Sequence, residues 1–259
     1  MSAVAEIKDR ISDAEQIAAG LMRRARIAQE IFADADQARV DEAVRALAWS
    51  LYKPEHAREL AELAVKDTGL GNVPDKIIKK QRKTFGTLRD LLRAKSVGEI
   101  EREDKRGIVK FAKPMGVVGA VTPSTNPGAT PVNKAMMAIK GRNAVVIAPS
   151  PLGYETTKRT VDFMRAALER TGLPADLVQI LPPPVTKEIT EALMKAADLV
   201  PKWKNMRADL ARQLALFESA TQSTSRTKGL QPALAIGSLK RIIAELDQLV
   251  AHYSSDRKL

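Results

Sequence analysis

Three segments rich in proline and in hydroxyl-bearing residues carry the groups best suited to ligand chemistry. They are TPSTNPG at 122–128, APSPLG at 148–153 and LPPPV at 181–185, and each follows a short apolar run. Such segments present backbone N–H groups, hydroxyls and, at Asn126, one side-chain amide, with few bulky side chains in the way. The residue types alone leave two interpretations open: a ligand pocket, or three tight turns.

Several kinds of catalytic centre are excluded by composition. The 259 residues contain no cysteine, which excludes thiol nucleophiles, disulfides and thiolate metal sites within them. His56 and His252 lie far apart in the sequence, so we expect neither a histidine metal site nor a Ser–His pair, and both are interpreted as surface residues. We predict no metal. Neither a dinucleotide glycine fingerprint nor a Walker A loop is present.

The chain is strongly basic, with a net charge of +11. A basic surface suits an anionic cofactor such as CoA or a dinucleotide, whereas nucleic-acid binding is the weaker alternative because the basic residues are spread along amphipathic stretches. The densest basic run, KIIKKQRK at 76–83, is interpreted as a solvated helix face. We find no signal-peptide pattern and no membrane-length apolar run, and we therefore expect a cytoplasmic location.

The first 113 residues are expected to be helices followed by one hairpin. Apolar residues recur at three- and four-residue steps through 4–97, which is typical of amphipathic helices, with breaks at Lys53-Pro54 and Gly69–Pro74. Residues 98–113 change to a strand-like pattern around a charged turn ending at Gly107, which predicts a β-hairpin. So short a hairpin must pack on its own domain or on a partner subunit.

From residue 114 onwards strands alternate with helices. Apolar strands are predicted at 115–123, 143–151 and 176–184, and helices at 127–140, 153–172 and 186–197. Strands of this kind separated by helices favour a parallel sheet covered on both faces. In such sheets ligands bind beyond the carboxyl ends of the strands, where the three polar segments lie.

Local residues predict where these elements begin and end. Pro127 suits the first turn of its helix, Gly172 closes the second helix, and Thr186 is a candidate N-cap of the third. ADLV at 197–200 is interpreted as the start of a fourth strand, which Pro201 stops.

We therefore expect an α/β fold in four parts. They are an N-terminal helical layer (1–97), a β-hairpin (98–113), a partial doubly wound, Rossmann-like parallel sheet built as a βαβαβα nucleotide-binding unit (114–200), and a helical tail of unrelated character (201–259). The tail is expected to hold two helices joined by a polar linker.

The run PMGVVGAVTPSTNPGATPVNKAMMAIKGRNAVVIAPSP at 114–151 resembles the start of the nucleotide-binding domain of acylating aldehyde dehydrogenases, and so does 172–200. The T-N-P at 125–127 and the A-P-S-P at 148–151 favour the CoA-acylating branch of that family. Within that branch, the sequence is most similar to the sulfoacetaldehyde-type enzymes. Nothing in 201–259 is recognisable as family sequence.

The resemblance implies oxidation of an aldehyde to an acyl-CoA, with NAD or NADP as hydride acceptor and CoA as cosubstrate. Asn126 matches the amide donor of the family's oxyanion hole, although an Asn before Pro can also simply stabilise a turn. The loop beside the nicotinamide and its ribose is matched by Thr122, Pro123, Ser124 and Thr125. The loop beside the adenine ribose is matched by Ala148, Pro149, Ser150 and Pro151, and the adenine itself is flanked by Pro182 to Pro184. Ala148 and Pro151 stand where hydrolytic relatives usually carry Lys and Glu, so the choice between NAD and NADP stays open.

This family's chemistry runs through a cysteine, and no cysteine is present. We therefore expect a truncated acylating aldehyde dehydrogenase-like protein that is inactive alone. The alternative is a non-enzymatic interaction or assembly partner, which binds a full-length paralogue or forms a homo-oligomer through the hairpin.

Overall fold

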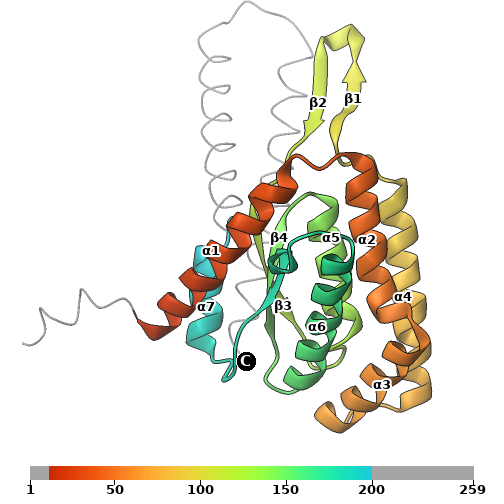
Figure 1. The fold of residues 1–259 in the computed structure, drawn as a ribbon, viewed down its shortest axis with the longest axis vertical. Helices are drawn as coiled ribbons and strands as arrows, with labels where there is room; N and C mark the ends of the chain where they lie inside the picture. The colour runs from red at the N-terminus through yellow and green to blue at the C-terminus, as the bar shows by residue number, and fades with distance from the viewer. Residues whose placement is uncertain (1–11, 200–259) are drawn as a thin grey trace, which may run out of the picture. The chain divides into compact units, whose positions relative to one another are not determined.

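A computed structural model of the chain describes residues 12–199, which lie in one compact unit (Figure 1). Four helices come first: α1 (Asp13–Ala33), α2 (Gln37–Tyr52), α3 (Pro54–Thr68) and α4 (Val73–Arg93). The hairpin follows, with β1 (Gly98–Glu103) and β2 (Ile108–Ala112). The remainder is β3 (Val117–Thr122), α5 (Ala129–Lys140), β4 (Ala144–Pro149), α6 (Tyr154–Arg170), β5 (Val178–Ile180) and α7 (Lys187–Ala196).

The predicted α/β architecture is confirmed. Strands β3, β4 and β5 form a parallel sheet in that order, and β3 and β4 stay in register from Val117 opposite Ala144 to Thr122 opposite Pro149. Helices α1 and α7 lie on one side of the sheet and α5 and α6 on the other, with α2, α3 and α4 packed outside α5 and α6 (Figure 1). One hydrophobic core runs from α1 and α2 through the sheet to α7.

Several helix ends follow the sequence prediction. Helix α3 begins at Pro54 directly after α2, and Thr186 caps α7 by accepting a hydrogen bond from the N–H of Ile189. Helix α6 ends at Arg170, and Gly172 just beyond it adopts a left-handed conformation with φ +68°. In each case a neighbouring residue suffices to end or begin the helix.

Three predicted boundaries are wrong. Pro127 lies in the turn before α5, which begins at Ala129 with Gly128 as its N-cap. The third strand is confined to 178–180, because the prolines at 182–184 have no N–H to continue a ladder. Residues 197–199 form no strand.

Asp198 binds the edge of β3 that β4 leaves free. Its N–H donates to the carbonyl of Val117 over 3.0 Å, and its Oδ2 accepts from the N–H of Val117 over 2.8 Å. The carboxylate thus takes the place of a ladder partner at this end of the sheet, and Arg26 holds it from α1 over 2.8 Å. Within the described residues, the predicted fourth strand hydrogen-bonds β3 through Asp198. Val200 onwards, with the predicted two-helix tail and His252, lies outside the described residues, as does the stretch before residue 12.

The hairpin predicted at 98–113 is confirmed and projects from the body of the unit (Figure 1). Its turn closes at Gly107, and its ion pairs, such as Lys110 to Glu101 at 2.7 Å, are exposed and contribute little stability. Phe111 is 58% exposed on this hairpin. Within the described part of the chain, no helix is both long and apolar enough to cross a bilayer.

Candidate functional site

The loops that follow β3 and β4 lie side by side. Thr122 pairs with Pro149 in the last register position of the two strands, and the N–H of Ser150 then donates to the carbonyl of Thr122 over 3.0 Å. The two segments predicted to form one site, 122–128 and 148–153, therefore leave the sheet together at its carboxyl edge.

The predicted site residues differ in how much of them faces outwards. Pro123, Thr125 and Pro151 are exposed, whereas Ser124, Asn126 and Ser150 are half-buried. Thr122, Ala148 and Pro149 are buried and belong to the strands, so the second loop begins at Ser150. The hydroxyl of Thr122 is buried with no hydrogen-bond partner among the described residues. A buried hydroxyl without a protein partner is costly, and it makes the end of β3 a polar position.

Asn126 occupies the turn between β3 and α5. Its carbonyl accepts a hydrogen bond from the N–H of Thr130 over 3.3 Å, while its side-chain amide binds none of the described residues. A turn-stabilising Asn would use that amide or its oxygen on a neighbouring backbone group. The amide is thus free to donate to a ligand, and its oxyanion role stays a prediction.

The start of α6 packs tightly on the first loop. Thr157 donates a hydrogen bond to the carbonyl of Pro127 over 3.0 Å. Gly153 has φ +107°, and a Cβ placed on it would lie 3.1 Å from Cβ of Pro127 and 3.3 Å from Cγ2 of Thr68. Only glycine fits this junction without strain.

Gly153→Ala is expected to lower the free energy of unfolding by about 1–3 kcal/mol, because alanine is strained at this φ and its methyl group meets Pro127. Urea unfolding followed by circular dichroism measures the change. Gly86→Ala is the matched control: Gly86 lies in α4 with open space around it, so this change should stabilise slightly. A Gly153→Ala variant as stable as the native protein would contradict this packing.

The N-terminus of α6 is already occupied by a protein carboxylate. Asp67, at the end of α3, accepts hydrogen bonds from both the N–H and the hydroxyl of Thr156, each over 2.9 Å. A helix N-terminus satisfied in this way has little remaining attraction for a phosphate. Sequence reasoning missed Asp67, because its partner lies 89 residues away in the chain.

The interpretation of 76–83 as a solvated helix face is wrong for Lys80. This side chain is only 3% exposed, and Thr84, one turn further along α4, is fully buried. Residues four apart share a face of a helix, and here that face packs against α5 and α2. Burial, followed by the nearby charges of Lys76 and Lys79, lowers the pKa of Lys80 to about 8.

His56 makes two structural contacts. It is half-buried, stacks on Phe163 with ring centroids 3.7 Å apart, and has Nδ1 2.8 Å from the carbonyl of Ser50. Among residues 12–199, no group of three histidine, aspartate or glutamate side chains is arranged to hold a metal ion.

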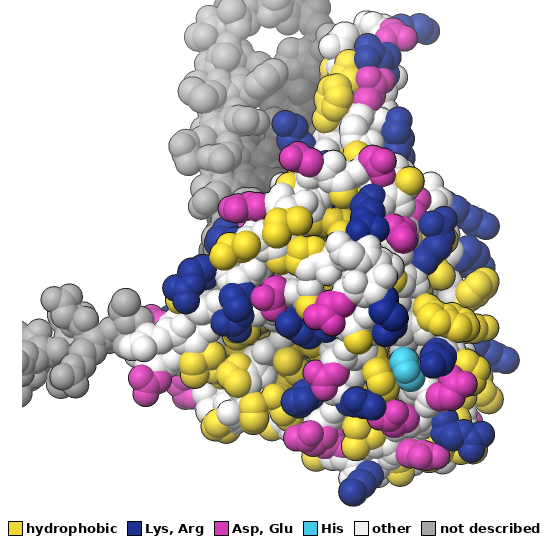
Figure 2. Space-filling view, in the orientation of Figure 1, with side chains coloured by type: hydrophobic (Ala, Val, Ile, Leu, Met, Phe, Trp, Pro, Cys, Tyr) yellow, Lys and Arg dark blue, Asp and Glu magenta, His cyan; other side chains and the backbone are white. Residues whose placement is uncertain are grey.

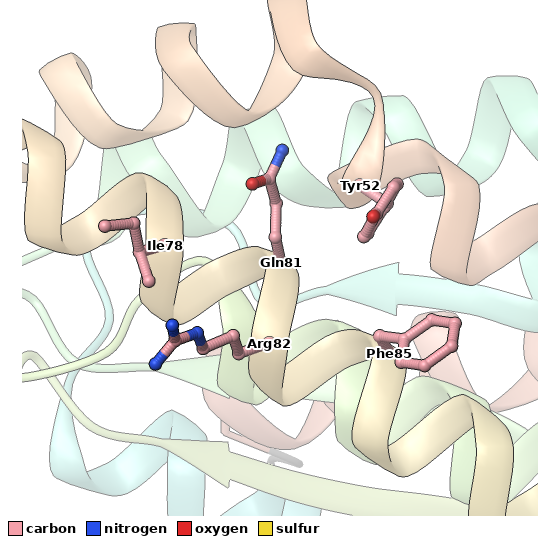
Figure 3. Close-up of a pocket in the computed structure, with 5 residues that line it drawn as sticks. All are labelled: Tyr52, Ile78, Gln81, Arg82 and Phe85. Atoms are coloured by element: carbon pink, nitrogen blue, oxygen red, sulfur yellow. The ribbon is translucent and has the colours of Figure 1, made fainter.

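A shallow pocket of about 310 Å³ lies on the outer side of α2 and α4, lined by Tyr52, Ile78, Gln81, Arg82 and Phe85 (Figure 3). None of the predicted site residues lines it. Its walls are partly aromatic, with Tyr52 and Phe85 rings 6.4 Å apart, and they contain no nucleophile or carboxylate. The loops after β3 and β4 are therefore the better candidate site.

The charged side chains do not form one basic patch on the face seen in Figure 2. Lys and Arg are scattered among Asp and Glu over this face, which is not the continuous stripe expected of a nucleic-acid groove. This distribution agrees with the sequence analysis.

Residues 4–201 match the family model described as "Aldehyde dehydrogenase family". The chain is 54% identical over 187 residues to an acylating sulfoacetaldehyde dehydrogenase of Cupriavidus necator, covering 72% of this chain and 38% of the relative. It is 48% identical over 179 residues to an acylating sulfoacetaldehyde dehydrogenase of Bilophila wadsworthia, covering 69% and 38%.

Among solved structures, an acetylating aldehyde dehydrogenase from Geobacillus thermoglucosidasius superposes with a TM-score of 0.67 at 34% identity. The match covers 70% of this chain and 40% of that one. The chain thus spans about two fifths of the length of these relatives.

Proposed function

The chain belongs to the aldehyde dehydrogenase family, and from this premise we propose that its loops after β3 and β4 form one half of an NAD(P) site for the oxidation of an aldehyde to an acyl-CoA. The hydrogen bond from Ser150 to Thr122 carries the proposal, because it joins the two loops that the family resemblance assigns to one dinucleotide. The free amide of Asn126 and the unpartnered hydroxyl of Thr122 support it as polar groups left for a ligand.

Each loop has a distinct task in this proposal. Residues 122–125 lie beside the nicotinamide ribose, and 148–151 lie beside the adenine ribose. Asn126 donates its amide N–H to the carbonyl oxygen of the aldehyde as negative charge develops there, which a neutral donor does without adding a titrating charge. A bound NAD(P) supplies the hydride acceptor, and CoA takes the acyl group.

The aldehyde itself is proposed to be anionic and of the sulfoacetaldehyde type. The first two relatives named above carry that substrate in their names, at 54% and 48% identity. The net charge of +11 is compatible with an anionic substrate and cofactors.

The polypeptide of 259 residues is expected to show no turnover by itself, because it contains no thiol. The described histidine, His56, binds the carbonyl of Ser50, whose hydroxyl donates to the carbonyl of Leu47. The test is CoA-dependent NADH formation from sulfoacetaldehyde, read at 340 nm, with the Cupriavidus necator enzyme as positive control. The expected rate equals the protein-free blank. CoA-dependent turnover by the purified chain would contradict the proposal.

A second candidate function is assembly with another chain, either a second copy or a full-length paralogue. The observation that favours it is the projecting hairpin, on which Phe111 is 58% and Ile100 43% exposed (Figure 1). Light scattering after size exclusion, alone and with a full-length relative, tests it, with Phe111→Ser as the disrupting variant. A monomer that binds no relative would rule this candidate out.

A further inference from the structure

Lys80 is a buried lysine that no acid among the described residues neutralises. Its side chain is 3% exposed on the face of α4 that packs against α5, and no carboxylate within residues 12–199 pairs with it. The charges that act on it come from Lys76 and Lys79, both positive. An ammonium on so enclosed a side chain is poorly hydrated, so a partner of negative charge would stabilise it.

The other fully enclosed lysine of the unit shows the contrast. Lys140, on α5, has its Nζ 2.5 Å from Oδ1 of Asp41 on α2. Lys134 is also partly buried on α5, but its Nζ donates to the carbonyl of Val121 over 2.5 Å. Each of these two ammonium groups has a protein acceptor, whereas Lys80 has none among the described residues.

Lys80 lies against the start of α5. A Cβ placed on Gly128 would be 2.9 Å from Cε and 3.8 Å from Nζ of Lys80, so the lysine occupies the space that a side chain at 128 would fill. Gly128 is the N-cap of α5 and provides no side-chain cap. At the start of this 12-residue helix the N–H of Thr130 donates to the carbonyl of Asn126 and Pro131 has no N–H, so the N–H groups of Gly128 and Ala129 are the ones that remain beside the positive charge of Lys80.

These two features together describe an anion site. A helix N-terminus attracts negative charge through its N–H groups and its dipole, and a desolvated ammonium adds a full charge at short range. Thr84, one turn from Lys80 on the same face of α4, has a buried hydroxyl without a partner among the described residues. The site lies two residues from Asn126, the proposed donor to the aldehyde oxygen.

We propose that Lys80 and the N-terminus of α5 bind the anionic group of the aldehyde substrate, a sulfonate or a carboxylate. This group lies at the opposite end of the substrate from the carbonyl oxygen, to which Asn126 donates its hydrogen bond. This inference rests on the proposed function for the identity of the ligand. It makes Lys80 a residue that determines specificity for anionic aldehydes over neutral ones. The desolvated ammonium gains most from a partner that enters with its own charge.

The test is an NMR titration of the whole chain, following the amide signals of Gly128 and Ala129. The probes are 2-hydroxyethanesulfonate, glycolate, inorganic sulfate and the neutral ethylene glycol. We expect the organic anions to shift these signals and ethylene glycol to leave them unchanged. Lys80→Met should weaken 2-hydroxyethanesulfonate binding about tenfold or more, while Lys83→Met, at an exposed position of the same helix, should not change it.

In the anion titrations, the proposal would be overturned by equal binding to Lys80→Met or by equal weakening in Lys83→Met. It would also be overturned by sulfate binding as tightly as the organic anions, which would indicate a site for free inorganic anions. A parallel titration with NAD⁺, followed at Ser124 and Ser150, reports on the proposed function separately. NAD⁺ binding without organic-anion binding would remove this inference and leave the dinucleotide site standing. Displacement of 2-hydroxyethanesulfonate by NAD⁺ would assign the anion site to a cofactor phosphate and would equally overturn it.

Discussion

Asp41→Ala is expected to lower the free energy of unfolding by about 3–5 kcal/mol. Asp41 Oδ1 lies 2.5 Å from Nζ of Lys140, whose side chain is 5% exposed between α2 and α5. Removing the carboxylate leaves a full positive charge in the interior without a partner. The same carboxylate also accepts a hydrogen bond from Gln37 over 2.9 Å, and that bond is lost too.

The neighbouring residue provides the control. Glu42 pairs with Arg39 at 2.6 Å, but its side chain is 50% exposed, so Glu42→Ala should cost below about 1 kcal/mol. Native-state hydrogen exchange at the amides of β4, which lies in the core of this unit, measures the free energy of unfolding of both variants. The double variant Asp41→Ala, Lys140→Met should recover most of the loss, since it removes the stranded charge. A cost for Asp41→Ala as small as that for Glu42→Ala would show that the pair is not buried in solution.

Lys80→Met is expected to act in the opposite direction and to raise the free energy of unfolding at pH 7 by roughly 2–3 kcal/mol. Burial lowers the pKa of Lys80 in the folded protein to about 8 from an ordinary value of 10.5. Below pH 8 the ammonium is charged in both states and the folded state bears the full cost of desolvation. Methionine fills nearly the same volume without that charge.

The pH dependence has a definite sign. Between pH 8 and 10.5 the unfolded chain holds more protons at Lys80 than the folded one, so native stability rises with pH in this window. The advantage of Lys80→Met should therefore be complete below pH 8 and should fade as the pH approaches 10.5. Urea unfolding at pH 7 and pH 10 measures the stability difference at both ends of this window, with Lys83→Met, at an exposed position of α4, as control. A Lys80→Met variant less stable than the native protein at pH 7 would mean that Lys80 already has a favourable partner.

Asp41→Ala and Lys80→Met together distinguish a buried lysine that stabilises the fold from one that destabilises it. A lysine that is paired, as Lys140 is by Asp41, contributes to the fold, whereas a lysine that weakens the fold is retained for another reason. Natural proteins accept such costs at sites that bind ligands. Opposite signs in the measured stabilities of the two variants would therefore support the anion site.

Local patterns were sufficient to predict the order and type of the described elements. Apolar strands alternating with helices indicated the parallel sheet, the Lys53-Pro54 step separated α2 from α3, and Gly107 marked the hairpin turn. These features depend on a few neighbouring residues, which the sequence displays directly.

Contacts between distant segments could not be predicted in this way. Asp198 binds Val117 across 81 residues of sequence, and this contact replaces the fourth strand that the residues at 197–200 suggested. Lys80 sits in a basic run whose spacing is equally typical of a solvated face, and only the packing of α4 against α5 buries it. Residue type and spacing do not reveal which side of a helix another helix will cover.

The loops of the candidate site, 122–128 and 148–153, could be predicted in part. Parallel strands place their carboxyl ends at one edge, so the meeting of 122–128 with 148–153 followed from the fold class. The exposure of individual residues did not follow, since Thr122, Ala148 and Pro149 are buried at the strand ends while Pro123 and Pro151 are exposed. The roles of single residues in cofactor binding remain predictions.

The most direct test of the dinucleotide half-site is a two-dimensional amide NMR spectrum of the isotope-labelled chain during titration with NAD⁺ and with NADP⁺. Saturable shifts are predicted at Ser124, Thr125, Asn126 and Ser150, which come from both loops, with smaller effects on α3 and on the hairpin. Shifts that avoid these four residues, or a spectrum that neither dinucleotide changes, would contradict a cofactor site at the carboxyl edge of β3 and β4.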